Sequence, residues 1–307
     1  MRNRDRKRGE ELLRRIAAFE KTQRPLPGIS NAAARRALVE QMVESIRRNE
    51  YIAVIRARGC SESRLDPASP IFDPIRAAIL NAKSGNLDEA FWLTFLFVHF
   101  GKHRRSGYRL VQDVYGGLGG VRWSWPKVSA DPFGFRHWLD RNEAGIKIRG
   151  GKFGNHRKYQ SLSAWKPAGT GAAVESYVKW VVTKGGHERL VSGVEAKYGG
   201  DRRRVFHDLY LRMSTVVSFG RTARFDFLTM VGKLGLANIE PPYAYMQGAT
   251  GPLEGARLLF GHPGLPAGKA EHEVVALEKD LGVGMQVMED SLCNWQKSPS
   301  LFIPFRG

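Results

Sequence analysis

The chain is poor in cysteine. Among its 307 residues there are only two, Cys60 and Cys293, which lie far apart and form no Cys-x-x-Cys pair. A structural zinc site or an iron-sulfur cluster needs about four cysteine ligands or a matching set of histidines. Neither can therefore be built from these cysteines. Such low cysteine usage favours a reducing compartment, and we expect a cytoplasmic protein that needs no cofactor.

Long hydrophobic runs are also missing. No stretch approaches about 18 uninterrupted apolar residues, the length that a membrane-spanning helix requires. The basic N-terminus, residues 1–8, leads into a charged helical pattern rather than the apolar core of a signal peptide. We therefore expect a soluble protein with no membrane partner.

Strand patterns and internal repeats are absent too. The segment 145–154 is rich in glycine and lysine, but Phe153 follows Lys152, so the Gly-Lys-Ser/Thr ending of a phosphate-binding P-loop is not present. Helical spacing of apolar residues instead recurs along the whole chain. It predicts an all-α fold of one domain, residues 1–307, in which two lobes could meet near residues 145–165. The main predicted helices span residues 10–21, 32–49, 74–83, 87–100, 108–115, 170–184, 187–198, 201–217, 222–233, 271–281 and 283–295. Asp73-Pro74 and Asp131-Pro132 each predict a capped helix start, and the segment 87–100, apolar nearly all round, predicts a central buried helix.

Acidic residues are scarce relative to basic ones. There are 48 Lys and Arg against 30 Asp and Glu, which gives a formal net charge of +18. An excess of this size favours a polyanion such as DNA or RNA and predicts salt-dependent affinity. A merely basic, soluble surface is the alternative.

The stretch Ser218 to Phe227 concentrates charge in an apolar frame. It brings Arg221, Arg224 and Asp226 into a short helix that Thr222 would cap. The apolar face of this helix, Phe225, Leu228 and Val231, is expected to point into the core. In one interpretation the arginines hold phosphate while Asp226 does chemistry. In the other, the stretch is an ordinary Arg-Asp ion pair at the start of a helix.

Two further groups of polar residues are candidate nucleic-acid contacts. The segment 153–159 gathers an amide, an imidazole and two cations, which can bind a phosphate and read a base edge or can form a solvated basic loop. The last helix carries Glu289 and Asp290, of which only one can face a given site because adjacent positions point about 100° apart. The candidate contacts are Asn155, His156, Arg157, Lys158, Asn294, Gln296 and Lys297.

Arg47 and Arg48 are expected to close the second predicted helix. There their charge would complement the helix dipole or contact the substrate. His99 and His103 have the i,i+4 spacing of metal ligands, but no Glu stands between them in a His-Glu-x-x-His pattern. The glycine-rich stretch 248–257 is similar to a helix-hairpin-helix turn, and an ordinary connection is the alternative.

The whole chain resembles the α-glutamyl/putrescinyl thymine pyrophosphorylase family, clade 3. The resemblance rests on motifs spread from end to end: residues 24–28 (RPLPG), 45–48 (SIRR), 72–74 (FDP), 88–92 (DEAFW), 99–103 (HFGKH), 153–159 (FGNHRKY), 219–226 (FGRTARFD), 250–252 (TGP) and 289–297 (EDSLCNWQK). Within this clade the chain is similar to bacteriophage-replication-inhibiting DNA glycosylases. The resemblance implies an all-helical relative of helix-hairpin-helix DNA glycosylases that acts on hypermodified pyrimidines in phage DNA.

Three functions follow as hypotheses. The preferred one is an anti-phage glycosylase that excises glucosylated 5-hydroxymethylcytosine from double-stranded phage DNA, without an obligate protein partner. The hairpin offers no clear lysine nucleophile, which favours simple hydrolysis to an abasic site. We rank the catalytic carboxylate candidates as Asp226, Asp290 and Glu289. The alternatives are an amine transferase that hypermodifies 5-hydroxymethyl pyrimidines, as the family name describes, and a non-catalytic DNA-binding protein.

Overall fold

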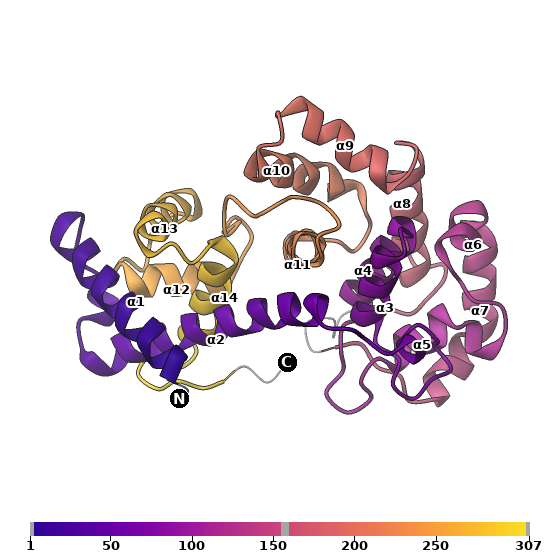
Figure 1. Cartoon of the computed structure of the whole chain (residues 1–307), viewed down its shortest axis with the longest axis horizontal. Helices are drawn as coiled ribbons and strands as arrows, with labels where there is room; N and C mark the ends of the chain where they lie inside the picture. The colour runs from indigo at the N-terminus through magenta and orange to yellow at the C-terminus, as the bar shows by residue number, and fades with distance from the viewer. Residues whose placement is uncertain (1–2, 155–159, 305–307) are drawn as a thin grey trace. The chain divides into compact units, whose positions relative to one another are not determined.

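The computed structural model describes residues 3–154 and 160–304. Within these ranges the chain forms fourteen α-helices and no strand, which confirms the predicted all-α fold (Figure 1). Two isolated bridges, His103 with Gly107 and Ser161 with Gly169, are the extended pairings in this part of the chain. In the ranges described, no helix combines the length and the apolar character that a bilayer crossing demands.

The described chain divides into two compact units. Unit 1 contains residues 3–52 and 241–304, and unit 2 contains residues 53–154 and 160–240. Residues 145–165, where two lobes were expected to meet, coincide with neither boundary and belong to unit 2 in so far as they are described.

Unit 1 is built around one apolar core. The spacing of Leu12, Ile16 and Phe19 along the first helix places all three side chains in this core, where Trp295 is also fully buried. The Trp295 indole N–H donates to the Pro299 carbonyl at 2.9 Å, which satisfies its one donor. The helices of this unit are α1 (Asn3–Thr22), most of α2 (Ala32–Ala57), α12 (Gly251–Leu259), α13 (Ala267–Leu281) and α14 (Met285–Trp295).

Helices α12 and α14 pack closely because glycines line their contact. A Cβ atom on Gly255 would lie 2.4 Å from the Leu292 carbonyl oxygen, and one on Gly251 would lie 2.5 Å from the Cys293 sulfur. These glycines therefore serve helix packing. Residues 236–250 contain no helix, so no helix leads directly into the turn before α12, and the helix-hairpin-helix resemblance is not confirmed.

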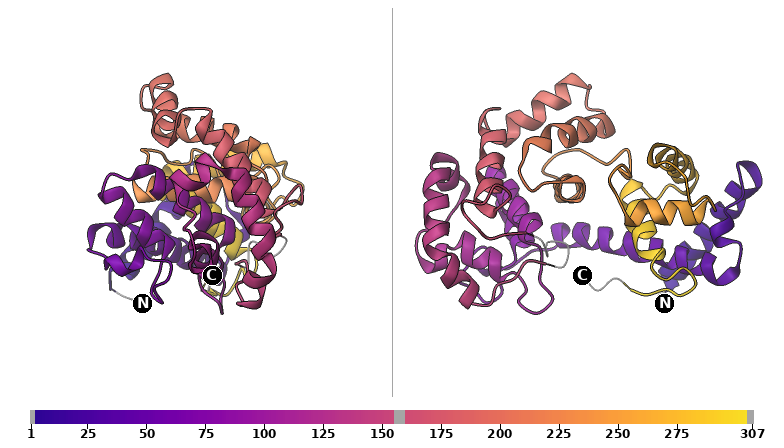
Figure 2. Two further views of the ribbon diagram at one scale, coloured as in Figure 1. Left: turned by 90° about the vertical axis from the view of Figure 1, so that its right-hand side faces the viewer. Right: turned by 180° about the vertical axis from the view of Figure 1, so that it is seen from behind.

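Unit 2 is centred on α4 (Leu87–Phe100). As predicted, this helix is buried nearly all round, and it packs against α3, α5, α6, α9 and α11. Helices α9 and α10 also contact each other and lie side by side in Figures 1 and 2. The other helices of this unit are α3 (Pro74–Lys83), α5 (Arg109–Tyr115), α6 (Trp125–Ala130), α7 (Pro132–Ile148), α8 (Thr170–Val182), α9 (His187–Lys197), α10 (Arg202–Arg212) and α11 (Arg221–Leu234).

Several helix starts follow the predicted capping chemistry. The Asp73 carboxylate accepts from the backbone N–H groups of Ile75 and Arg76, and Pro74 occupies the first helical position. Asp131 caps α7 in the same way, by accepting from the Gly134 N–H at 2.7 Å. These local rules fixed both starts correctly.

Two predicted boundaries are wrong. Helix α11 begins at Arg221 with Gly220 as its N-cap, so Thr222 is its exposed second residue rather than its cap. Helix α2 continues to Ala57, which places Arg47 and Arg48 within the helix instead of at its end. No proline or glycine interrupts residues 49–57, so the helix has no local reason to stop.

Candidate active site

The predicted site residues fall into both units. Unit 1 holds the candidates of α2 and α14, which are Arg47, Arg48, Glu289, Asp290, Asn294, Gln296 and Lys297. Unit 2 holds the candidates of α11, which are Arg221, Arg224 and Asp226. The remaining candidates, Asn155, His156, Arg157 and Lys158, lie outside the described residues.

Four of the predicted residues form one polar cluster in unit 1. Arg48 and Lys297 are its cations, and Asp290 and Asn294 are its central residues; we call these four the α2–α14 cluster. Arg48 donates to Asp290 Oδ2, and the Asn294 amide donates to Asp290 Oδ1 at 2.9 Å. Lys297 donates to Asn294 Oδ1 at 3.2 Å. Both oxygens of the Asp290 carboxylate are therefore held by donors, which fixes its orientation.

The spacing along α14 explains this cluster. Met288, Leu292 and Trp295 face the core and are fully buried. Asp290 and Asn294 are four residues apart on the same partly exposed side of α14, so their side chains contact each other. The Asp290 side chain remains 28% exposed, so the carboxylate is both oriented and open to solvent.

The cluster also joins two sequence motifs. Arg48 lies 242 residues before Asp290, yet the two side chains form an ion pair. They belong to the stretches 45–48 and 289–297, two of the motifs that define the family resemblance. Helical periodicity alone gave no signal that these two stretches meet.

The other unit 1 candidates lie outside this hydrogen-bonded group. The Arg47 guanidinium lies 3.1 Å from Glu44 and 3.7 Å from Asp5, so nearby carboxylates compensate its charge. The Gln296 amide donates to the Cys293 carbonyl at 3.3 Å at the end of α14. Glu289 is half-buried, one position before Asp290.

In unit 2, helix α11 buries the apolar face that its sequence predicts. Phe225, Leu228 and Val231 are buried, and the Arg221 guanidinium lies 5.5 Å from the centre of the Phe225 ring. Asp226 is half-buried in the second turn. The apolar prediction for this helix is therefore confirmed, while the chemical role of Asp226 stays a prediction.

Arg224 has a structural partner. Its guanidinium lies 4.3 Å from the centre of the Tyr210 ring and donates to the Tyr210 carbonyl at 3.1 Å. It thereby connects α11 to α10 through stacking and a charged hydrogen bond. Arg224 therefore has a structural role, and its contact with phosphate stays a prediction.

A buried polar chain in unit 2 was missed by the sequence analysis. The His187 Nδ1 lies 2.6 Å from Asp88 Oδ1, and its Nε2 lies 2.7 Å from the Tyr177 hydroxyl. Burial lowers the pKa of His187, while the hydrogen bond from His187 lowers the pKa of Asp88. A neutral imidazole therefore donates from Nδ1 to the Asp88 carboxylate and accepts the Tyr177 proton at Nε2.

The hydrogen-bonded order Asp88, His187, Tyr177 is similar to that of a catalytic triad, in which a carboxylate orients a histidine that activates a hydroxyl nucleophile. The His187 imidazole and the Tyr177 hydroxyl, however, are not accessible to a substrate. Burial raises the pKa of the Tyr177 hydroxyl well above its usual range, and the side chains of Tyr177 and His187 are almost completely buried. A substrate cannot reach a hydroxyl so enclosed. The chain connects α4, α8 and α9, and we assign it a structural role.

His99, the first histidine of the i,i+4 pair, has a structural hydrogen-bond partner. His99 Nε2 lies 3.0 Å from the Thr170 hydroxyl, whose own proton goes to the Ser161 carbonyl at 3.0 Å. His99 must therefore donate from Nε2. Across residues 3–154 and 160–304, no group of three or more His, Cys, Asp or Glu side chains is arranged to hold a metal ion.

Fold, charge and motifs together define an all-helical, strongly basic protein with an oriented carboxylate in unit 1. The chain belongs to the family described as alpha-glutamyl/putrescinyl thymine pyrophosphorylase clade 3, whose model matches residues 33–307. This family is linked to the hypermodification of pyrimidines in DNA and to phage, and it is associated with enzymes. No curated protein and no solved structure matches the chain.

Proposed function

We propose that this protein is an anti-phage DNA glycosylase that hydrolyses the N-glycosidic bond of a hypermodified pyrimidine, glucosylated 5-hydroxymethylcytosine. The product would be an abasic site in viral DNA. The observation that carries the proposal is the Asp290 carboxylate, oriented by Arg48 and Asn294 and still partly exposed. Family membership and the net charge of +18 support DNA as the substrate.

The cluster suits the charge that this reaction develops. As the C1′–N bond breaks, its electron pair leaves with the base and the sugar acquires oxocarbenium character. A carboxylate with a fixed orientation stabilises that positive charge and takes a proton from the attacking water. The water oxygen then bonds to C1′, and the released base is protonated. Arg48 and Asn294 leave lone pairs on both Asp290 oxygens for this water.

Asp226 and Glu289 remain candidates for the same role. Asp226 ranks first on the sequence, since its helix also carries Arg221 and Arg224, which could hold a phosphate or the sugar hydroxyls of the glucose. Asp290 is favoured by its contacts, because Arg48 and Asn294 each donate to one of its two oxygens. In this proposal Lys297 and Arg47 contact phosphates, while Asn294 and Gln296 read the base or the glucose.

The decisive experiment offers the enzyme modified DNA without any cosubstrate. Purified protein is incubated with DNA that carries glucosylated 5-hydroxymethylcytosine and with unmodified DNA of the same sequence. Released base is measured by mass spectrometry, and abasic sites are scored as alkali-labile breaks. The proposal predicts release from the modified DNA alone.

The family name supports a second candidate, an amine transferase that acts on pyrophosphorylated 5-hydroxymethyl pyrimidines. That reaction would require an amine and a pyrophosphorylated base, and it would leave the glycosidic bond intact. Product formation only when both are supplied, with no abasic sites, would replace the glycosylase by this transferase. DNA binding with neither product would favour a non-catalytic DNA-binding protein.

A further inference from the structure

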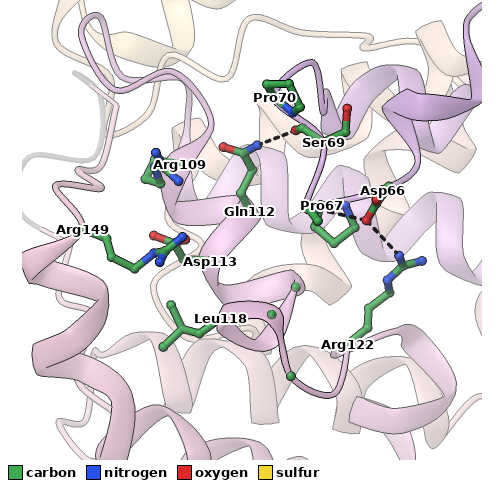
Figure 3. A pocket seen from close by; sticks show the side chains of 14 residues that line it. Asp66, Pro67, Ser69, Pro70, Arg109, Gln112, Asp113, Leu118, Arg122 and Arg149 are labelled. Carbon is green, nitrogen blue, oxygen red and sulfur yellow. Dashed lines mark hydrogen bonds and ion pairs between the residues drawn. The ribbon is translucent and has the colours of Figure 1, made fainter.

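Unit 2 contains a pocket of about 570 Å³ that none of the predicted site residues lines. Its walls are the loop 66–70, helix α5, the glycine-rich turn 116–120 and Arg149 after α7 (Figure 3). This volume lies within the usual range for small-molecule sites, about 300–1,000 Å³. The pocket is therefore large enough for a nucleotide.

The two main walls are fixed to each other. The Gln112 amide on α5 donates to the Ser69 carbonyl at 3.1 Å, which ties the loop 66–70 to the helix. A Cβ atom on Gly116 would lie 2.9 Å from Pro67 Cβ and 2.7 Å from the Gln112 carbonyl oxygen. Glycine is therefore needed where these walls approach, and the pocket is a built feature of the unit.

Positive charge dominates the lining. Arg109, Arg122 and Arg149 contribute three guanidiniums, against the two carboxylates of Asp66 and Asp113. Arg109 is exposed, and its positive charge acts on the nearby Asp113 carboxylate. Arg122 lies 3.6 Å from Asp66, and both side chains are about half exposed, so this pair is weak. Arg109 and Arg122 are therefore available to an anion.

Asp113 positions the third guanidinium. Its side chain is 3% exposed, and its Oδ1 accepts from Arg149 Nε at 2.9 Å. Its Oδ2 is buried and has no hydrogen-bond partner among the described residues. A buried carboxylate that is only half satisfied is costly. The contact holds the Arg149 guanidinium at the wall of the pocket, beside the space that a ligand would occupy.

Apolar side chains also line the pocket. Pro67 and Pro70 line one wall and Leu118 lines another, and Figure 3 shows these side chains beside the arginines. Leu118 has a backbone φ of 58°, a left-handed conformation that is strained for a residue with a side chain. Such strain is often retained at binding sites. The apolar surface suits a sugar or a base, while the guanidiniums suit phosphate.

We propose that this pocket binds the phosphate group of a nucleotide, with Arg109 and Arg122 as its direct contacts and Arg149 held in place by Asp113. The phosphate belongs to a free nucleotide or to a DNA strand, which share this chemistry. None of the residues that line the pocket belongs to the α2–α14 cluster or to α11. It does not depend on the glycosylase proposal.

The test compares two double variants that each remove two positive charges from unit 2. Arg109→Ala/Arg122→Ala removes the proposed contacts, and Arg58→Ala/Arg141→Ala removes two exposed arginines that line no described pocket. Affinity for deoxycytidine 5′-monophosphate and for a short oligonucleotide without a terminal phosphate is measured by calorimetry. Loss of two charged hydrogen-bonding partners should weaken binding by about tenfold or more.

The two probes distinguish the sources. If Arg109→Ala/Arg122→Ala binds only the mononucleotide more weakly than the control variant does, the ligand is a free nucleotide. If it binds only the oligonucleotide more weakly, the ligand is a backbone phosphate. Equal affinities of the two double variants for both probes would overturn the proposal. Ala68→Trp fills the pocket from an exposed position without changing its charge. Ala68→Trp should lower the affinity for the same probe as the arginine variant does, which would show that the effect does not come from charge removal alone.

Discussion

At the scale of single residues, the proposed chemistry depends on how the Asp290 carboxylate is held. Its carboxylate receives Arg48 on one oxygen and Asn294 on the other, while 28% of the side chain stays exposed. An exposed pair of this kind contributes little to stability, at most about 1 kcal/mol. We expect the ion pair to orient the Asp290 carboxylate for catalysis, and loss of this orientation would lower the rate of the chemical step.

Arg48→Met therefore separates orientation from folding. It keeps the aliphatic length but removes the donors to Asp290, and we expect kcat for base release to fall by about 10–100-fold while KM for DNA changes little. Arg48→Lys should recover part of the loss. Steady-state kinetics measure this, with Arg36→Met as the control, because Arg36 is an exposed arginine of the same helix. Equal losses in both methionine variants would remove Arg48 from the mechanism.

His187 should make stability depend on pH. Burial lowers its pKa in the folded state below the ordinary value of 6.5, so the unfolded chain binds the proton more readily. Stability from this group is fully present above pH 6.5 and is lost as the pH falls below it, by at most about 1.4 kcal/mol per pH unit.

His187→Gln cannot take up this proton. We expect urea unfolding at about pH 7.5 and pH 5.5 to show a smaller loss of stability in the variant than in the wild type. The variant should also be less stable at the higher pH, because it breaks the hydrogen bonds to Asp88 and Tyr177. An identical pH dependence would show that His187 does not titrate in this window.

At the scale of helices, close packing of α12 on α14 depends on Gly255. An alanine there places Cβ 2.4 Å from the Leu292 carbonyl oxygen, and backbone cannot easily move away. We expect Gly255→Ala to destabilise unit 1 by about 1–3 kcal/mol despite the better helix propensity of alanine.

Gly193→Ala is the matched control, since it lies within α9 and its Cβ would meet nothing within 4 Å. This change should stabilise the protein by about 1 kcal/mol. Urea unfolding midpoints measure both variants. A stabilising Gly255→Ala would mean that α12 and α14 pack less closely than the structure indicates.

The helices also show how far the sequence alone could lead. The apolar run 87–100 and the Asp-Pro starts at residues 73 and 131 predicted α4, α3 and α7 well, because these signals are local. The end of α2 was predicted too early, since two arginines resemble a helix end but do not break one.

Site residues were harder to predict because they depend on contacts distant in sequence. Asp290 and Arg48 were each singled out, but no periodicity shows that they meet across 242 residues. Asp113 and the arginines of the unit 2 pocket carry no motif of their own. Only the packing of α5 against the loops 66–70 and 116–120 brings them together.

At the scale of the whole molecule, the dominant property is its net charge of +18. A protein that contacts four or more phosphates should lose about a hundredfold or more in DNA affinity between about 50 and about 200 mM salt. Fluorescence anisotropy with labelled duplex DNA measures this slope. Affinity that is independent of salt would exclude phosphate contacts as the main source of binding.

A substitution of Lys297, one cation of the α2–α14 cluster, tests whether this surface contacts DNA phosphates. Lys297→Ala should reduce the log–log salt slope by about 0.9, the contribution of one phosphate contact. Lys279→Ala, an exposed lysine on α13, provides the control with the same loss of charge. Equal slopes in both variants would place the phosphates away from Lys297.

In the proposed mechanism, an oriented carboxylate activates the water that hydrolyses the glycosidic bond of a modified pyrimidine. The most direct measurement is single-turnover base release from DNA with glucosylated 5-hydroxymethylcytosine by Asp290→Asn and Asp226→Asn. Asp280→Asn and Asp140→Asn are exposed controls in unit 1 and unit 2. We expect Asp290→Asn to slow release by about 10²–10⁴-fold while both controls keep wild-type rates. Wild-type release by Asp290→Asn would contradict this assignment, and wild-type release by Asp226→Asn as well would exclude both aspartates as the catalytic carboxylate.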